Sequence, residues 1–301
     1  MAYLASNLLQ DAYRKLGMLE VRTATGGSTT TVVDSGFVGI KNAPKDDAWL
    51  NGTLFIVRDA AGTNVAPENE FQRISGYAAS TGTFTLDTAL TSSASASDTY
   101  AYTTAEVPLR SMLELANAAL QALGTISLVD TTTLDTASPQ TEYACSAIWK
   151  RPRPIRVDVQ GNSDSGDNAW IESRDWDYQP ATGGATGLII FGHQPESGMG
   201  IRVWYNGLHP TLTAYNSVVH ESVPPELAAL TLAEKALEWL NTRYRGSDEF
   251  MLQRLSDAKV QRQQYEATNP VWRVRRKPKL LITAEYAADV FPSRYGPVWR
   301  K

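Results

Sequence analysis

The sequence predicts a mixed α+β protein: a small helical bundle of about four helices, interrupted by two antiparallel β-rich modules and followed by an extended C-terminal arm. Amphipathic stretches with helical spacing occur near the start, in the middle and near the end of the chain. The segments between them are rich in Ser, Thr and Gly and contain short alternating runs, as strands do. Charge is also divided: residues 269–301 hold eight Lys or Arg against two acids, a net +6, and because the 301-residue chain carries −4, the remainder carries −10.

Four segments place apolar residues on one helical face. Gly17 is a natural stop for the first, Pro108 opens the second where a missing N–H costs nothing, and Ser247 is a candidate cap for the fourth. The short connection between the last two predicts an antiparallel helix hairpin. The predicted helices are residues 3–16, 107–123, 224–244 and 247–268. Their apolar faces predict a shared core that includes Met112, Trp239 and Met251.

Residues 18–104 predict the first β insert, and residues 124–222 the second β module. In the insert, alternation on both sides of a turn at 78–82 predicts a β-hairpin. Its strand candidates are 29–33, 53–58, 70–77, 82–87 and 99–103. Those of the module are 127–133, 142–146, 154–160, 169–178, 187–191 and 200–205. The helical core is then predicted from the segments 1–17, 105–123 and 223–268.

The C-terminal arm, residues 269–301, alternates basic residues with aromatic rings. Large rings on an extended segment need a partner that buries them, so we expect the arm to become ordered on contact with another subunit. The same basic cluster could bind phosphates, but a dedicated nucleic-acid reader is more usually basic over its folded domain. The predicted docking residues are Trp272, Arg273, Arg275, Arg276, Lys277, Lys279, Tyr295 and Trp299.

No catalytic motif is present, so the sequence predicts that the chain is not an enzyme and that it has no catalytic residues, metal ligands or cofactor. Cys145 is the only cysteine, which excludes an intramolecular disulfide. Residues 162–168 resemble a calcium loop faintly, but they lack the closing glutamate. Acids and aromatics gather at 170–178, where glycan binding or cleavage remains an alternative. If 169–178 is one strand, a single face carries Trp170, Glu172, Arg174 and Trp176.

The first 17 residues carry charges and lack the apolar centre of a signal peptide, and no run of about 18 apolar residues occurs. We therefore expect a chain that is made in a reducing cytoplasm and has no membrane partner.

The order of these segments resembles a known family. Residues 8–17 look like the opening helix of head-to-tail adaptor (connector or neck) proteins of tailed bacteriophages. Residues 33–35, 49–52 and 81–87 are similar to a β insert found in such proteins. The clearest local match is the segment 201–210 followed by 223–226, which in the family leads from a strand into the C-terminal helix hairpin.

The resemblance implies a structural virion protein in the neck, between capsid and tail. Copies of the chain would form a ring, typically a dodecamer, beneath the portal protein. The ring extends the channel for the genome's double-stranded DNA, which passes without sequence-specific binding, and it offers a platform to tail or nozzle proteins. The alternatives are a tail-tube or baseplate structural protein, a glycan-binding virion module, and a scaffold outside phages.

Overall fold

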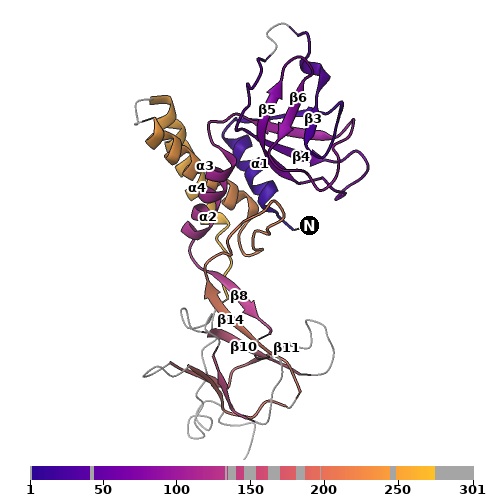
Figure 1. Ribbon diagram of the computed structural model, residues 1–301. Helices are drawn as coiled ribbons and strands as arrows, with labels where there is room; N and C mark the ends of the chain where they lie inside the picture. Colours follow the sequence, from indigo (N-terminus) through magenta and orange to yellow (C-terminus); the bar gives the residue numbers. More distant parts are fainter. Residues whose placement is uncertain are drawn as a thin grey trace, which may run out of the picture. The chain divides into compact units, whose positions relative to one another are not determined.

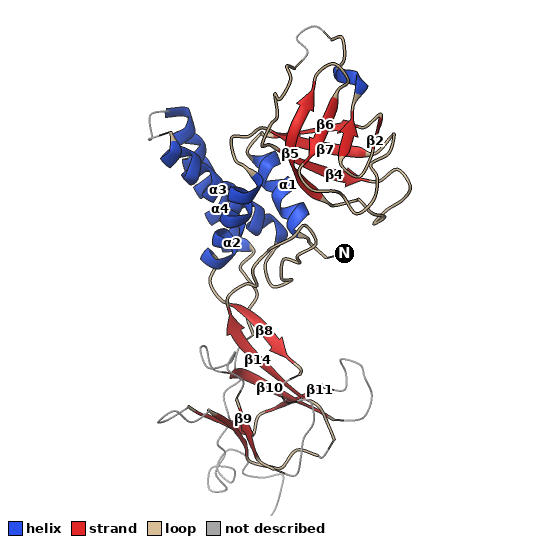
Figure 2. Ribbon diagram, viewed as in Figure 1, coloured by secondary structure: helices blue, strands red, loops and turns tan. Residues whose placement is uncertain are grey.

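The computed structural model describes residues 2–40, 44–132, 134, 140–145, 154–161, 170–180, 187–196, 198–244 and 249–274. These residues form four α-helices and three antiparallel sheets, so the predicted mixture of helices and antiparallel β-structure is confirmed (Figure 2). The chain divides into two compact units. Unit 1 comprises Met1–Ile126 and Leu208–Trp272, and unit 2 comprises Ser127–Gly207 and Arg273–Lys301. The predicted helices and the first β insert therefore share unit 1.

Each described helix lies within its predicted segment. The helices are α1 (Ala5–Lys15), α2 (Leu109–Ala122), α3 (Pro225–Arg243) and α4 (Glu249–Thr268). Pro108 stands directly before α2, and its carbonyl accepts the N–H of Met112 at 2.9 Å. The predicted cap Ser247 lies outside the described residues.

Helix α3 packs against α1, α2 and α4 (Figure 1). Apolar and small side chains are buried all around it, which is typical of a helix enclosed by neighbours. No side chain of α4 is fully buried, because this helix packs mainly on α3. The expected core residue Met112 is buried, whereas Trp239 and Met251 are only half-buried.

The first β insert folds into one seven-stranded antiparallel sheet with the order β1-β7-β4-β5-β6-β3-β2. The predicted hairpin is confirmed, since β5 and β6 pair across the turn. The unpredicted β1 pairs with β7; Leu19 and Val21 alternate with Glu20 and Arg22, but the strand is only five residues long and Val21 is 50% exposed. The strands are β1 (Leu19–Thr23), β2 (Gly26–Gly27), β3 (Thr31–Val33), β4 (Thr53–Arg58), β5 (Phe71–Ala78), β6 (Thr83–Leu86) and β7 (Thr99–Thr103).

Aromatic rings fill the interior of the insert. They meet edge-to-face or tilted, the arrangements that aromatic pairs prefer, and they include Phe37, Trp49, Tyr77, Phe84 and Tyr102. The insert also contacts the first helix. The Tyr13 ring lies 6.0 Å from that of Phe55, and its hydroxyl donates to the Val107 carbonyl at 2.7 Å. The ring contact joins α1 to the insert, and the hydroxyl joins α1 to the segment that precedes α2.

Unit 2 contains two antiparallel sheets with a common core of Val157, Trp176, Ile189, Phe191 and Val203. The four-stranded sheet has the order β11-β10-β14-β8, and the three-stranded sheet has the order β12-β13-β9. The strands are β8 (Ile126–Asp130), β9 (Glu142–Ala144), β10 (Pro154–Gln160), β11 (Trp170–Ser173), β12 (Trp176–Gln179), β13 (Leu188–Phe191) and β14 (Ile201–Gly207).

The expectation of one strand over 169–178 was wrong. The chain turns between β11 and β12, and β11 pairs with β10 while β12 pairs with β13. Trp170 and Trp176 therefore belong to different sheets and share no face. The corner is held by the Gly192 N–H, which donates to the Asp175 carbonyl at 2.9 Å. Period-two alternation does not reveal where a chain crosses from one sheet to another.

The segment that joins β14 to α3, here called the 208–223 loop, has no helix or extended strand but is firmly attached within unit 1. The Ala5 N–H donates to the Ser217 carbonyl at 2.8 Å. The Asn117 side chain of α2 accepts the Leu212 N–H at 2.7 Å and donates to the Leu212 carbonyl at 3.0 Å. The loop is therefore fastened to α1 and to α2.

Candidate docking site and polar clusters

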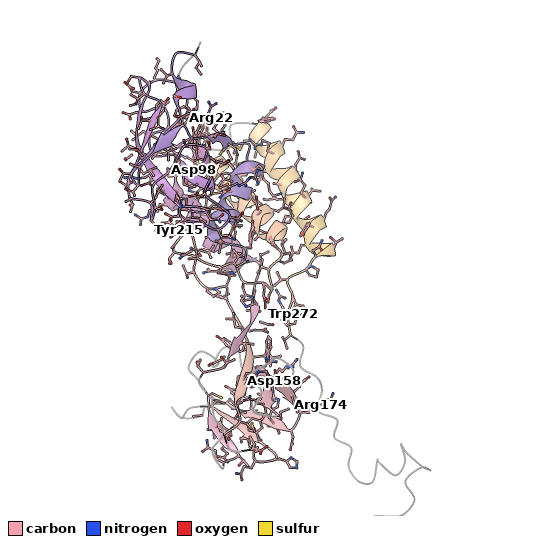
Figure 3. All side chains as sticks on the ribbon, turned by 90° about the vertical axis from the view of Figure 1, so that its right-hand side faces the viewer. Arg22, Asp98, Asp158, Arg174, Tyr215 and Trp272 are labelled. Carbon is pink, nitrogen blue, oxygen red and sulfur yellow. The ribbon has the colours of Figure 1, made fainter. Side chains whose placement is uncertain are left out.

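The predicted docking residues are only partly within the described chain. Trp272 and Arg273 follow α4, and Trp272 is labelled in Figure 3. The Trp272 N–H donates to the Ser222 carbonyl at 2.9 Å, while the residue as a whole stays 55% exposed. The start of the arm is thus bound through its main chain and presents an indole at the surface. The other predicted docking residues lie outside the described residues: Arg275, Arg276, Lys277, Lys279, Tyr295 and Trp299.

Helix α4, which precedes the arm, is attached to α3 by ion pairs. Arg262 pairs with Glu234, which is only 6% exposed, and Lys259 pairs with Glu238 at 3.1 Å. Burial alone would raise the pKa of Glu238, but the hydrogen bonds from Lys235 and Lys259 outweigh it and hold that pKa below its usual range. Apolar side chains remain exposed on α4, namely Phe250, Leu252 and Val260. Exposed apolar side chains of this kind suit contact with a protein surface.

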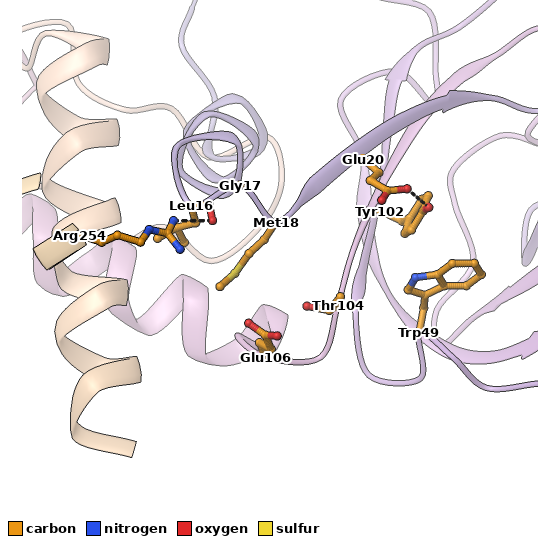
Figure 4. Close-up of a pocket in the computed structure, with 9 residues that line it drawn as sticks. All are labelled: Leu16, Gly17, Met18, Glu20, Trp49, Tyr102, Thr104, Glu106 and Arg254. Carbon is orange, nitrogen blue, oxygen red and sulfur yellow. Dashed lines mark hydrogen bonds between the residues drawn. The ribbon is translucent and has the colours of Figure 1, made fainter. Parts of the chain in front are cut away.

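A hollow of about 250 Å³ lies in unit 1 near the end of α1 (Figure 4). Arg254 reaches it from α4 and donates to the Leu16 carbonyl at 2.8 Å, and the Tyr102 hydroxyl donates to the Glu20 carboxylate. Burial, and then this bond to Glu20, raises the pKa of Tyr102 well above its usual value. Tyr102 therefore keeps its proton at neutral pH and is a poor general base.

A larger hollow of about 840 Å³, also in unit 1, has apolar side chains from α2 and the 208–223 loop, including Leu109, Leu113 and Leu212. Arginines line the same hollow. Arg73 pairs with Asp87 at 2.8 Å, and Arg243 donates to the Glu106 carbonyl at 3.0 Å. The lining holds no His, Cys, Ser or Tyr, and its two carboxylates, Asp87 and Glu114, pair with Arg73 and Arg110. Apolar and guanidinium groups together are suited to protein contact.

A cluster of polar side chains in the described part of unit 2 was not predicted. Asp158 on β10 is fully buried and labelled in Figure 3. Its carboxylate accepts from Arg156 Nε at 2.5 Å, Arg202 Nε at 2.6 Å and Trp204 Nε1 at 2.8 Å. The Arg202 guanidinium also lies over the rings of Trp170, at 4.9 Å, and Trp204, at 5.5 Å. The sequence signal was the alternation of Arg and Asp on one strand and of Arg and Trp on its neighbour.

Electrostatics support a structural role for this cluster. Burial alone would raise the pKa of Asp158, but the hydrogen bonds from Arg156, Arg202 and Trp204 outweigh burial and lower it. The carboxylate is therefore charged at neutral pH and is occupied by three donors. A general base must have a lone pair open to substrate, so Asp158 is a poor candidate for that role.

The other sequence candidates are not brought together. Trp176 lies in the core of unit 2 at 5% exposure, while Trp170 lies beneath Arg202 in the other sheet, so the two rings form no common platform for a sugar. The calcium-like loop 162–168 lies outside the described residues. His193 contacts Asp175 at the surface, whereas His209 and His220 lie in the 208–223 loop.

Within the described parts of the chain, no three or more metal-binding side chains form a group. None of the described helices combines the length and apolar character that crossing a membrane requires. No protein-family model matches the chain, and no curated protein or solved structure matches it either.

Proposed function

We propose that the chain is a structural subunit of a phage neck, a head-to-tail adaptor that forms a ring beneath the portal and supports tail attachment. The observation that carries the proposal is the order of elements. A helix, a β insert, a second helix, a second β module and a helix hairpin precede a basic and aromatic arm. The resemblance to adaptor proteins rests on this same order.

In this proposal the four helices form one bundle, from which the two β modules emerge. The packing of α1, α2 and α4 on α3 supports such a bundle. The modules would then be free to contact neighbouring copies and the next ring of the neck. Ring subunits need several such surfaces, because each one meets a neighbour on both sides.

Charge supports different roles for the arm and for the rest of the chain. Outside the arm the chain carries −10, and like charge keeps duplex DNA from adhering to a channel wall. The arm carries +6 with interleaved aromatic rings, and Arg and Trp are frequent anchors in protein interfaces. We therefore assign the arm to portal or subunit docking, and the acidic body to the DNA conduit.

The chemistry of the described residues supports a structural role better than an enzymatic one. Burial raises the pKa of the Cys145 thiol to about 11, which leaves it protonated and weakly nucleophilic at neutral pH. The fully buried carboxylate of Asp158 is occupied by three donors. The proposal requires no cofactor.

The direct test is electron microscopy of negatively stained particles after the purified protein is mixed with a portal ring. We expect an additional ring on one end of the portal. We also expect the protein alone to be monomeric or polydisperse by sedimentation, because the arm then lacks the surface that orders it. Portal alone and an unrelated protein of similar size are the controls. Portal particles that stay unchanged at saturating protein would refute the proposal.

A further inference from the structure

Two imidazoles occupy the 208–223 loop: His209 is buried and His220 is half-buried. His209 is 4% exposed, and its Nδ1 lies 2.6 Å from the Pro210 carbonyl oxygen. Since a carbonyl can only accept, Nδ1 carries the proton of a neutral ring. The other nitrogen, Nε2, accepts the main-chain N–H of His220 at 2.9 Å. The ring of His209 therefore bridges two distant parts of the loop.

The second imidazole continues the chain of hydrogen bonds. Nδ1 of His220 accepts the N–H of Ser222 at 3.2 Å. Ser222 is 3% exposed, and its carbonyl accepts the N–H of Trp272, the first aromatic residue of the arm, at 2.9 Å. The hydrogen bonds thus run without interruption from Pro210 to the start of the arm, and both ends belong to unit 1.

We infer that the 208–223 loop is a pH-sensitive latch on the C-terminal arm: neutral His209 and His220 shape the loop so that it binds the main chain of Trp272, and their protonation releases it. An imidazole that carries two protons has no lone pair and cannot accept. Protonation of His209 would leave the His220 N–H unpaired, and protonation of His220 would do the same to the Ser222 N–H. A buried donor without an acceptor is costly, so the loop would open.

The surroundings of the two rings favour the neutral, latched form. Burial lowers the pKa of both, and the nearby His220 lowers that of His209 further, against the bond to Pro210. At His220, the negative charge of Glu221 raises the pKa and so partly offsets the effect of burial. On the helices packed against the loop, the carboxylates of Asp11 and Glu226 pair with Arg14 and Lys15.

The direction of the pH dependence follows from these shifts. A histidine whose pKa is lowered on folding contributes full stability above the pKa of the unfolded chain, about 6.5. That contribution is lost as the pH falls through the lower pKa of the folded state. The latch is therefore closed at neutral pH and opens in mildly acidic solution. It rests on the loop alone and does not depend on the proposed function.

The test is amide hydrogen exchange in the full chain at about pH 7.5 and about pH 5, expressed as protection relative to an unstructured chain at each pH. We expect the amides of His220, Ser222 and Trp272 to lose protection at the lower pH, by at most about tenfold per pH unit for each imidazole. Amides in the middle of α3 should keep theirs. Unchanged protection of these three amides in the natural protein would overturn the latch, whatever the behaviour of any variant.

A double variant, His209→Gln with His220→Asn, separates the histidines from other titrating groups. The Gln Oε1 replaces the acceptor Nε2 and the Asn Oδ1 replaces the acceptor Nδ1, and neither amide is protonated in this range. We expect the main-chain amide of Trp272 in this variant to stay protected from hydrogen exchange at the lower pH. His193→Gln, which changes an exposed histidine of unit 2, should behave like the natural protein. Equal loss of protection in the double variant would assign the effect to carboxylates such as Glu221 and refute the inference.

Discussion

At the scale of single residues, Asp158 organises one face of the four-stranded sheet in unit 2. It lies between Arg156 on its own strand and Arg202 on β14, whose positive charges would otherwise repel each other. The carboxylate compensates both charges and lets Arg202 lie over the flanking indoles. The opposite face of the sheet packs on the apolar core, so the two faces are stabilised by different means.

We predict that Asp158→Asn destabilises unit 2 by about 3 kcal/mol, because removing one partner from a buried ion pair leaves the other charge uncompensated. The change would be measured as the loss of amide protection in β10 and β14. The natural pKa of Asp158 is lowered, so its contribution is present above the unfolded pKa of about 3.9 and is lost as the pH falls through the folded value.

The control is Asp257→Asn, the same chemical change on the exposed surface of α4 in unit 1. It should leave β10 and β14 fully protected. Equal protection of these strands in Asp158→Asn and in the natural protein would show that the cluster contributes little stability.

At the scale of elements, α4 is unusual because ion pairs with α3 replace full burial of its side chains. Arg262 contacts both Glu234 on α3 and Glu266 on α4 itself. Met251 and Leu255 are half-buried and add some apolar contact. The backbone amide hydrogens of a helix held in this way exchange with solvent more readily than those of a buried helix, since few buried contacts oppose its opening.

We predict that Arg262→Ala loosens α4 from α3 by about 2 kcal/mol, because Glu234 would remain nearly buried without its partner. Amide exchange should accelerate over α4 and stay slow in α3. Arg110→Ala is the matched control, since it removes an Arg–Glu pair that is largely exposed on α2, and it should have no measurable effect. Equal effects of the two substitutions would contradict a special role for the α3–α4 pair.

The elements that the sequence predicted well are those with a strong local pattern. The four helices and the hairpin formed by β5 and β6 each have their own periodicity and their own turn residues. The corner at Asp175 was missed because its cause is the contact with Gly192, a residue distant in sequence. The cluster around Asp158 and the hydrogen bonds of His209 were missed for the same reason: each joins residues brought together only by the fold.

At the scale of the whole molecule, the described structure places the start of the arm against the folded chain. The main chain of Trp272 is bound by Ser222, and the Val274 N–H donates to the Ser127 hydroxyl at 2.7 Å. A deletion that begins at residue 270 would remove both bonds together with the rest of the arm. A deletion that begins at residue 275 keeps both and removes most of the predicted docking residues.

We therefore predict that deletion of residues 275–301 leaves a folded subunit with an unchanged thermal midpoint that no longer binds the portal. Co-sedimentation with portal rings would measure binding. The reason is that six of the predicted anchors are lost while the described hydrogen bonds are retained.

A full-length variant with Gln at every Lys and Arg of 275–301 separates charge from aromatic contact, since it keeps Tyr295 and Trp299. If this variant still binds the portal, the aromatic rings are the anchors. If it does not bind, and added salt weakens the complex of the natural protein with the portal, charge is the dominant contribution to binding. Portal binding by the 275–301 deletion at the level of the full chain would remove the arm from the interface and transfer the docking role to surfaces such as α4.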